Sequence, residues 1–474
     1  MKAVGRSRAT PRAAALASST SSRVAVLRVI PRASSIARPS RLASHRVGGD
    51  ALGSSSRGNA SSTRLAVAYV DETLVDEPSA QELPAGFGGF SGMEGKALKI
   101  EKEDIPTVSQ VYGVIPKHCF KTNTWTSLKY AAMSTGICLG LGLLANAYIP
   151  VKLAFLPLWL AYAAVCGTAG FGFWLIGHEA GHGAFSENAL LQDVCGYISH
   201  TLCLTPYFSW QRSHAVHHSR VNHLIEGESH VPDLTGSKPY IRAMHWIKGK
   251  AGDVVHGCSA LFVICFGWIV YLLFGASGGP KYGLTNHFWP YGPFKSDLFP
   301  ERWHPKVLLS GAGVMAVLGA LGYWAYSVGS IWPVMAVYGG PYFVTIAWLG
   351  IVTLLHHTDT DVPHLDDEEW TWLRGAFLTI DRPYYKWVDF LQHHIGSTHV
   401  VHHLNPKIPH YHAQEATKAV REAFPHLYLY DPTPVHAALW RIVTNCLSVD
   451  KVEAKDGAGA KYVYVNKAAE KVRN

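Results

Sequence analysis

The sequence predicts an all-α integral membrane protein. We expect four transmembrane helices in two hairpins and a helical cap on one membrane face that holds a histidine-rich metal site. Of the 474 residues, 48% are hydrophobic and only 16% are charged, whereas about 25% are charged in typical soluble domains. Four apolar segments each approach the roughly 20 residues that span a bilayer core. Three clusters of histidines lie beside or between these segments.

The positive charge of the chain is concentrated at its N-terminus. Residues 1–49 contain nine Arg and one Lys but no acidic residue, and they are rich in Ser and Ala. This composition is typical of a transit peptide, and the absence of a continuous apolar core argues against a secretory signal. We therefore expect residues 1–65 to be a transit peptide, with a disordered basic tail as the alternative. Residues 50–474 carry 32 basic and 34 acidic residues, a balance that gives no indication of nucleic acid binding.

The rest of the chain divides into three parts. Residues 66–128 begin acidic and rich in Gly and Pro, and we expect a linker followed by a segment that precedes the membrane. Residues 129–450 are predicted to form the membrane domain, and residues 451–474 a polar C-terminal tail. The eight cysteines include no Cys-x-x-Cys pair and mostly lie in apolar runs. They indicate reduced packing residues, not a disulfide framework.

The two hairpins account for the four predicted spans. The first covers Tyr130–Ile149 and Leu153–Gly177, with a proline ending its first helix. The second covers Lys306–Ser327 and Ile331–Leu355. The first hairpin ends directly before one histidine cluster, which places that cluster at the membrane surface.

Two further apolar segments are not predicted to span. Ala189–Thr205 is interrupted by polar residues, so we expect it to lie in the membrane interface. Gly257–Gly275 is apolar enough to span, but a fifth span would put the last histidine cluster on the opposite face from the first two. One metal site cannot draw ligands from both faces, so we expect this segment to be interfacial or re-entrant.

Basic residues mark the face that carries the histidines as the cytosolic face, or as the stromal face in a plastid. They are Arg212, Arg220, Lys238, Arg242, Lys248 and Lys250.

Eight histidines form three clusters with spacings that suit one side of a helix. They are His178 and His182, then His214, His217 and His218, and finally His399, His402 and His403. A single histidine pair on a helix is usually core or surface decoration, but three clusters favour a metal. Neutral imidazole is a common ligand of transition metals. Eight ligands exceed the four of a closed zinc site, so two irons with open positions for oxygen fit the number better.

The three histidine boxes resemble those of the membrane-bound fatty acid desaturases. The flanking runs Pro206–His214, Trp372–Arg382 and Ile408–His412 resemble the methyl-end branch, and within it the omega-6 (delta-12) enzymes. The similarity covers roughly residues 113–465. Ala180 stands where this branch usually has Cys, at a position that is not a ligand in the family.

The resemblance implies a di-iron enzyme that takes O2 and two electrons. It would introduce a cis double bond into a lipid-linked monounsaturated acyl chain of the membrane, converting oleoyl to linoleoyl. The resemblance also aligns His357 with a further ligand, His356 being the weaker candidate, and it implies no catalytic residue beyond the ligands.

The electron donor must be a separate protein, because the chain contains no His-Pro-Gly-Gly haem motif and hence no fused cytochrome b5. By resemblance, the donor would be ferredoxin in a plastid or free cytochrome b5 in the endoplasmic reticulum. We expect a plastid (chloroplast) membrane, with the endoplasmic reticulum as the alternative.

Other polar residues near the boxes have less distinctive patterns. Five that follow the second box are candidates for orienting the ligand rings, although a solvated loop is the simpler interpretation of each. They are Asn222, His223, Glu226, Glu228 and His230. Four histidines that flank the third box are interpreted as structural or ring-orienting. They are His393, His394, His410 and His412. His118 is not expected to be a ligand.

Three alternative functions remain open. The first box fits His-Glu-x-x-His, so an intramembrane zinc protease would use Glu179 as its base, but it would leave the other two boxes idle. An acyl hydroxylase, acetylenase or epoxygenase would share all three boxes and differ in a few pocket residues. An omega-3 (delta-15) desaturase belongs to the same branch. Glu179 favours omega-6, because omega-3 members usually have Asp there.

Overall fold

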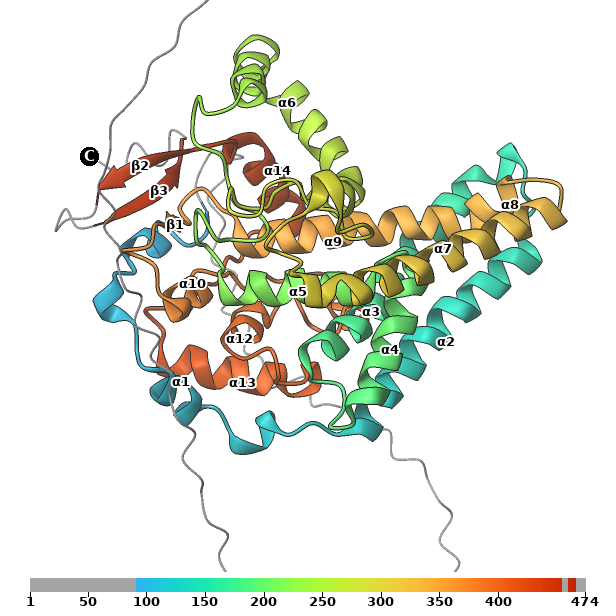
Figure 1. Ribbon diagram of the computed structural model, residues 1–474, viewed down its shortest axis with the longest axis horizontal. Coiled ribbons are helices and arrows are strands. Elements are labelled where there is room, and N and C mark those ends of the chain that lie inside the picture. The colour runs from blue at the N-terminus through green and yellow to red at the C-terminus, as the bar shows by residue number, and fades with distance from the viewer. Residues whose placement is uncertain (1–90, 454–458, 466–474) are drawn as a thin grey trace, which may run out of the picture. The chain divides into compact units, whose positions relative to one another are not determined.

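The computed structural model describes residues 91–453 and 459–465. The predicted transit peptide, residues 1–65, lies outside the described residues, as do residues 66–90 of the predicted linker and residues 466–474 of the predicted tail. The described part is mostly helical. Figure 1 shows long helices extending to one side of a group of short helices and a small sheet.

Five helical segments of the described part are long and apolar enough to cross a membrane, judged by length and composition. They are Thr124–Tyr148 (α2), Leu153–His182 (η5, Leu153–Phe155, with α3, Leu156–His182), Pro239–Phe274 (α6), Glu301–Ser327 (η7, Glu301–Trp303, with α7, His304–Ser327) and Trp332–His357 (α8, Trp332–Val334, η8, Met335–Gly339, and α9, Gly340–His357). The predicted count of four transmembrane helices is therefore not confirmed. The fifth candidate, α6, contains the segment that we expected to be interfacial or re-entrant.

Local sequence explains both ends of α2 and a break inside α6. The Asn123 side chain accepts a hydrogen bond from the Thr126 backbone amide at 3.0 Å and caps the start of α2. The helix ends at Tyr148, shortly before Pro150. Within α6, Gly252 has a φ of 79°, a conformation that favours glycine, and it separates a polar first part from an apolar second part.

The two hairpins meet where α3 packs against α9. At Gly167 an added Cβ would lie 2.5 Å from the Cβ of Val344, so this approach requires a residue without a side chain. The Thr345 hydroxyl donates to the Gly167 carbonyl at 3.0 Å, and the Trp348 indole donates to the Thr168 hydroxyl at 2.9 Å. These contacts fix the relative position of two helices that both end in histidines.

The remaining helices include two that flank the long ones, α4 (Ala189–Leu202) and α5 (Tyr207–Ser219). The others form a cap: α1 (Val108–Val114), α10 (Trp372–Phe377), α11 (Lys386–Leu391), α12 (His399–Leu404), α13 (His410–Ala423), α14 (Val435–Asn445), and the short turns η2 (Lys96–Lys99), η3 (Lys102–Asp104) and η4 (Lys117–Phe120). A further short turn, η6 (Gly292–Phe294), lies in the connection between α6 and α7. The cap core buries Phe377, Val400 and Leu404 together with Ala97 and Val111. The segment that precedes the membrane therefore packs onto the cap.

A buried ion-pair network ties α9 to the cap. Arg382 and Arg441 both pair with Asp359, at 2.6 Å each, and both also pair with Asp431. All four side chains are buried. Two positive and two negative charges balance, which is what buried charges require. The network fixes the chain just after the end of α9.

The fold is mostly helical but also contains a small antiparallel sheet. The all-α prediction is wrong in this respect. Its strand order is β1 (His364–Leu365), β3 (Ala460–Tyr464), β2 (Val449–Glu453). The register pairs His364 with Tyr462 and Val449 with Tyr464. The sequence hides the sheet because β1 has two residues and the other strands lie in a lysine-containing stretch that has the composition of a polar tail.

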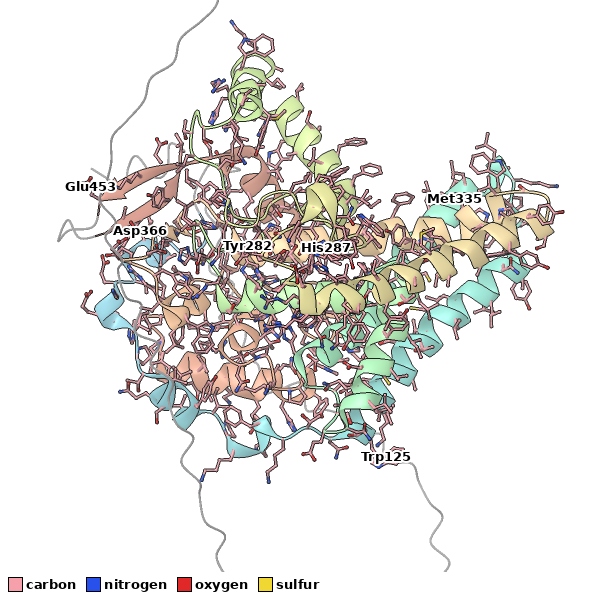
Figure 2. The ribbon with its side chains drawn as sticks, in the orientation of Figure 1. Trp125, Tyr282, His287, Met335, Asp366 and Glu453 are labelled. Carbon is pink, nitrogen blue, oxygen red and sulfur yellow. The ribbon has the colours of Figure 1, made fainter. Side chains whose placement is uncertain are left out.

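Figure 2 shows Met335 toward the far end of the long helices, and Asp366 and Glu453 at the sheet. His287 and Tyr282 lie between these two ends in that view. His287 belongs to a buried polar group at the junction: its Nε2 lies 3.1 Å from the Ser213 hydroxyl, which in turn lies 3.0 Å from the Tyr271 hydroxyl. Tyr271 donates its hydroxyl hydrogen to the Glu228 carboxylate at 2.5 Å. This group joins the C-terminal end of α6 to α5.

Candidate metal centre

The predicted ligands come from four helix ends. His178 and His182 lie in the last turns of α3, and the second box forms the C-terminal part of α5. The third box opens α12, and His357 is the last residue of α9. These ends meet where the long helices reach the cap (Figure 1). Histidines separated by up to 225 positions, as His178 and His403 are, thus share one site.

The structure brings these nine histidines together in two adjacent groups. The first group is His178, His182, His214, His218 and His402, and one nitrogen from each lies within 4.8 Å of the others. The second group is His217, His357 and His403, which meet the same limit. His399 joins the second group, because its Nε2 lies 3.1 Å from the Nε2 of His357. The His218 and His403 rings stack at 4.1 Å between centroids, so the groups are in contact.

The second and third boxes each serve both groups. In α5, His214 and His218 belong to the first group and His217 to the second. In α12, His402 belongs to the first group and His403 to the second. Consecutive residues project about 100° apart around a helix, so an adjacent pair of histidines diverges toward two centres. The spacing led us to expect that all histidines of a cluster project from one side of a helix. The second and third boxes do not follow this expectation, because each divides between the two groups.

The crowding of nitrogen atoms in the site fits a bound cation. The Nε2 of His357 faces the Nε2 atoms of His217 and His399, each at 3.1 Å. His178 and His182 face each other at 3.3 Å, and so do the Nε2 atoms of another pair, His214 and His218, at 3.1 Å. A neutral imidazole has one N–H and one lone pair, so one hydrogen cannot serve three converging nitrogens. Metal coordination satisfies several lone pairs at one point.

Burial keeps the site imidazoles neutral, which is the form that binds metal. Seven of the nine histidines are buried, and the other two are partly buried. Desolvation lowers the pKa of His217 to about 3 and that of His402 to about 4. The same cause, with repulsion between neighbouring rings, holds the pKa values of His214, His218, His399 and His403 well below the usual 6.5. Both groups consist of histidines alone.

The adjacent His356 and His357 differ in what their ring nitrogens contact. His356 places Nδ1 2.5 Å from the Ile380 carbonyl and Nε2 3.1 Å from the Tyr384 hydroxyl. Both of its nitrogens are thus engaged outside the site. His357 instead directs Nε2 to His217 and His399. The geometry favours His357 over its neighbour as a ligand.

Residues that orient the site differ from most of those that the sequence suggested. The Ser229 hydroxyl lies 2.9 Å from the Nδ1 of His217. The Asp381 carboxylate accepts a hydrogen bond from the Val400 amide at 2.8 Å and caps α12. Glu179 accepts from the backbone amide of His410 at 3.0 Å, which links the first box to the start of α13.

Among the five candidates after the second box, the polar side chains mostly pair elsewhere. His223 pairs with Asp367 at 2.8 Å, and Glu226 pairs with Arg220 at 2.8 Å. His230 alone has a ring near a site histidine, stacked over His357 with 6.2 Å between centroids. A serine within a polar loop matches no sequence motif, so the contact of Ser229 with His217 could be found only from the structure.

An aromatic layer borders the first group on the side of the long helices. Trp174 and Trp210 have rings 5.8 Å and 5.6 Å from that of His178. Trp268 meets Trp174 edge to face at 6.1 Å. Trp174 is fixed by donating to the Thr205 hydroxyl at 3.0 Å. These side chains replace water next to the histidines.

A family model described as fatty acid desaturase matches residues 155–433, a range that contains all nine histidines. The chain belongs to the fatty acid desaturase family. It is an integral membrane enzyme with the family's histidine-rich centre. It shares 36% identity over 392 residues with "Delta(12)-fatty-acid desaturase FAD2" of Vernicia fordii, covering 80% of this chain and 98% of that relative.

Two other relatives are equally similar. "Omega-6 fatty acid desaturase, endoplasmic reticulum isozyme 2" of Glycine max is 36% identical over 375 residues, 78% of this chain and 94% of the relative. "Oleoyl-12-hydroxylase FAH12" of Ricinus communis is 36% identical over 366 residues, 76% of this chain and 91% of the relative. Desaturation and hydroxylation thus occur in proteins that are equally distant from this chain.

Proposed function

We propose that this family member is an acyl-lipid omega-6 desaturase that uses O2 and two electrons to convert an oleoyl chain into a linoleoyl chain. The observation that carries the proposal is the double group of nine converging imidazoles, in a chain whose relatives are named delta-12 and omega-6 desaturases. The Ricinus communis relative, which is named as an oleoyl-12-hydroxylase, supports acyl hydroxylation as the second candidate.

The two groups of histidines are proposed to hold one iron each. The ligands would be His178, His182, His214, His217, His218, His357, His399, His402 and His403. Iron held by these residues would supply the oxidative chemistry that no side-chain acid or base can perform on an unactivated C–H bond. A site made only of neutral imidazoles leaves the metal charge uncompensated and suits exchangeable oxygen ligands better than thiolates would.

The protein's own contribution is to orient the rings and exclude water. Ser229 and the Asp381 cap of α12 would hold His217 and the third box in position. An acyl chain that reaches the first group from the bilayer would lie against the buried side chains of Trp174, Trp210 and Trp268. Their rings give a methylene chain an apolar surface beside the first group.

We propose that α6 lies along the membrane surface and that four helices span. Both ends of its apolar part contact elements on the histidine side: Gly257 packs against Trp440 of α14, and the Tyr271 hydroxyl lies 3.0 Å from the Ser213 hydroxyl of α5. A spanning helix would have one end on the far side of the bilayer. A different helix, α4, exposes Leu190, Val194 and Ile198 at four-residue spacing, which also suits an interfacial helix.

We further propose a plastid membrane location, with ferredoxin as the electron donor. The acid-free, Arg-rich residues 1–49 support this choice. The Glycine max relative is named as an endoplasmic reticulum isozyme, which keeps that membrane and cytochrome b5 as the alternative. A fluorescent protein fused after residue 65 would go to plastids, and retention in the reticulum would overturn the assignment.

The function is tested by expressing residues 66–474 in yeast, which makes monounsaturated but not diunsaturated acyl chains. We expect new 18:2 with its second double bond at delta-12, located by gas chromatography with mass spectrometry. The same culture with a co-expressed ferredoxin system controls for the electron donor.

Three other results would change the proposal. Product that forms only when linoleate is fed would indicate an omega-3 desaturase. A 12-hydroxy product would favour the second candidate. The absence of any product with both electron donors, in cells that accumulate the protein, would contradict both.

A further inference from the structure

A second cluster of metal-binding side chains lies on the cap, outside the histidine centre. It consists of His118 and Cys119 in η4 and His412 and Glu415 in α13, and one donor atom from each lies within 4.8 Å of the others. The two segments are almost 300 residues apart in sequence. We call these four residues the peripheral cluster.

Direct contacts hold the cluster together. The Nε2 of His118 lies 2.7 Å from the Glu415 carboxylate and 3.8 Å from the Cys119 sulfur. The His412 ring meets the His118 ring nearly at right angles, with 5.4 Å between centroids. His118 and Glu415 are about half exposed, whereas Cys119 is fully buried beneath them. An ion can therefore enter from solvent.

The donor set is that of zinc. One sulfur, two imidazoles and one carboxylate are four ligands of the types that zinc binds, at about 2.0–2.3 Å in a tetrahedron. Such a tetrahedron holds its ligand atoms roughly 3.3–3.8 Å apart. The His118–Cys119 distance of 3.8 Å already fits this range, and the 2.7 Å between His118 and Glu415 would have to widen by roughly 0.6 Å. The other donor atoms lie within 4.8 Å of one another, so they would have to approach by at most about an ångström. Half-exposed rotamers can make that adjustment.

A surface ion pair explains only part of this arrangement. The pairing of His118 with Glu415 needs neither the thiol nor the second imidazole. The buried Cys119 side chain nevertheless points toward the pair. His412 lies three residues before Glu415 in α13, and its ring contacts that of His118. Residues three apart on a helix lie on one side, so both α13 donors face η4.

We propose that the peripheral cluster binds one Zn²⁺ ion, which clips the segment before the membrane to the helix that follows the third histidine box. Asn123 and Tyr411 also link this junction: the Asn123 amide donates to the Tyr411 hydroxyl at 2.7 Å, and that hydroxyl donates to the Asn123 carbonyl at 3.3 Å. Zinc would bind the folded junction and not the separated segments, so it would stabilise the cap. The proposal does not depend on the di-iron assignment.

The test is the metal content of the full chain, purified from membranes in detergent and passed over a desalting column after exposure to equimolar Zn²⁺. Inductively coupled plasma mass spectrometry should find about one zinc per chain in the wild type. His118→Ala, Cys119→Ser, His412→Ala and Glu415→Gln should each lose most of this zinc. Iron content should be unchanged, because none of the four residues lies in either histidine group.

Two variants provide matched controls on the same surface. His426→Ala removes an exposed cap histidine outside the cluster, and Glu422→Gln neutralises an exposed carboxylate two turns further along α13. Both should keep the zinc. The half-exposed His118 and Glu415 positions tolerate substitution better than buried Cys119, and size-exclusion chromatography shows whether each variant stays folded.

Loss of zinc from the four cluster variants, with retention in both controls, supports the site. A lower thermal unfolding midpoint in the cluster variants than in the wild type, seen only when zinc is present, supports a stabilising zinc link between η4 and α13. Wild-type protein that retains no zinc would overturn the proposal. Zinc retained by folded His118→Ala and Glu415→Gln would also overturn it, because the ion would then lie elsewhere.

Discussion

The histidine centre and the peripheral cluster differ in the donors that they offer. The centre offers only imidazoles, almost all buried, whereas the peripheral cluster adds a thiol and a carboxylate and is open to solvent. The four donors of the peripheral cluster are enough to complete a tetrahedral zinc shell, and its thiolate and carboxylate would offset the charge of the ion. The neutral donors of the histidine centre would leave the charge of a bound metal uncompensated. The two proposed metal sites thus differ in donor type and exposure, although both gather several titratable groups.

The largest expected effect distinguishes the two sites directly. His214→Ala, like alanine at any of the other seven box histidines, should lower activity by at least roughly 100-fold, more than loss of a residue that only orients a ligand. His412→Ala should keep most activity. Product analysis in yeast, scaled to protein detected by immunoblot, measures both. Full activity in a box variant would remove that residue from the ligand set.

The next comparison uses two neighbours at the end of α9. His357→Ala should abolish activity in protein that still accumulates. His356→Ala should instead reduce accumulation, because two buried hydrogen bonds are lost at roughly 1–3 kcal/mol for each unsatisfied group, while activity per folded molecule persists. Equal activity loss per molecule in the two variants would contradict the different roles of these rings.

Ser229 tests whether ring orientation matters within the centre. Ser229→Ala removes the hydroxyl beside the Nδ1 of His217 and should weaken iron binding roughly 10- to 100-fold. The measurement is iron retained against a chelator series. Ser219→Ala is the matched control, because that hydroxyl bonds only the Val216 carbonyl of its own helix. Identical chelator curves for the two variants would show that Ser229 plays no part.

The smallest expected effect concerns Glu179. Glu179→Gln keeps an oxygen that can accept from the His410 amide, so activity should fall less than about tenfold. A zinc protease that used Glu179 as general base would lose roughly 10²–10⁴-fold. A loss of that size in the yeast assay would give Glu179 a chemical role that a desaturase does not need.

The convergence of the box histidines could be predicted from the sequence because the information for it is local, and their role as ligands stays a prediction. Helical spacing aims His178 and His182 together, and apolar length places them at a membrane surface. The spacing also contained the division into two groups, since adjacent histidines diverge by about 100° on a helix. This division can therefore be predicted without the structure.

Other features depend on contacts between distant segments. The sequence did not predict His118 as a ligand, and its partner Glu415 is almost 300 residues away. The third strand was hidden because β3 gains its partner only when the end of the chain returns to His364. The position of α6 likewise depends on packing against α14, which hydropathy cannot express.

The most direct test of the central claim is Mössbauer spectroscopy, with an iron count, on wild-type protein grown with ⁵⁷Fe. We predict two irons per chain, all bound by nitrogen or oxygen ligands. We also predict that His214→Ala and His357→Ala, one from each group, both lower the count. One iron per chain, or zinc in place of iron with both variants unaffected, would contradict a di-iron centre built from the two groups of histidines.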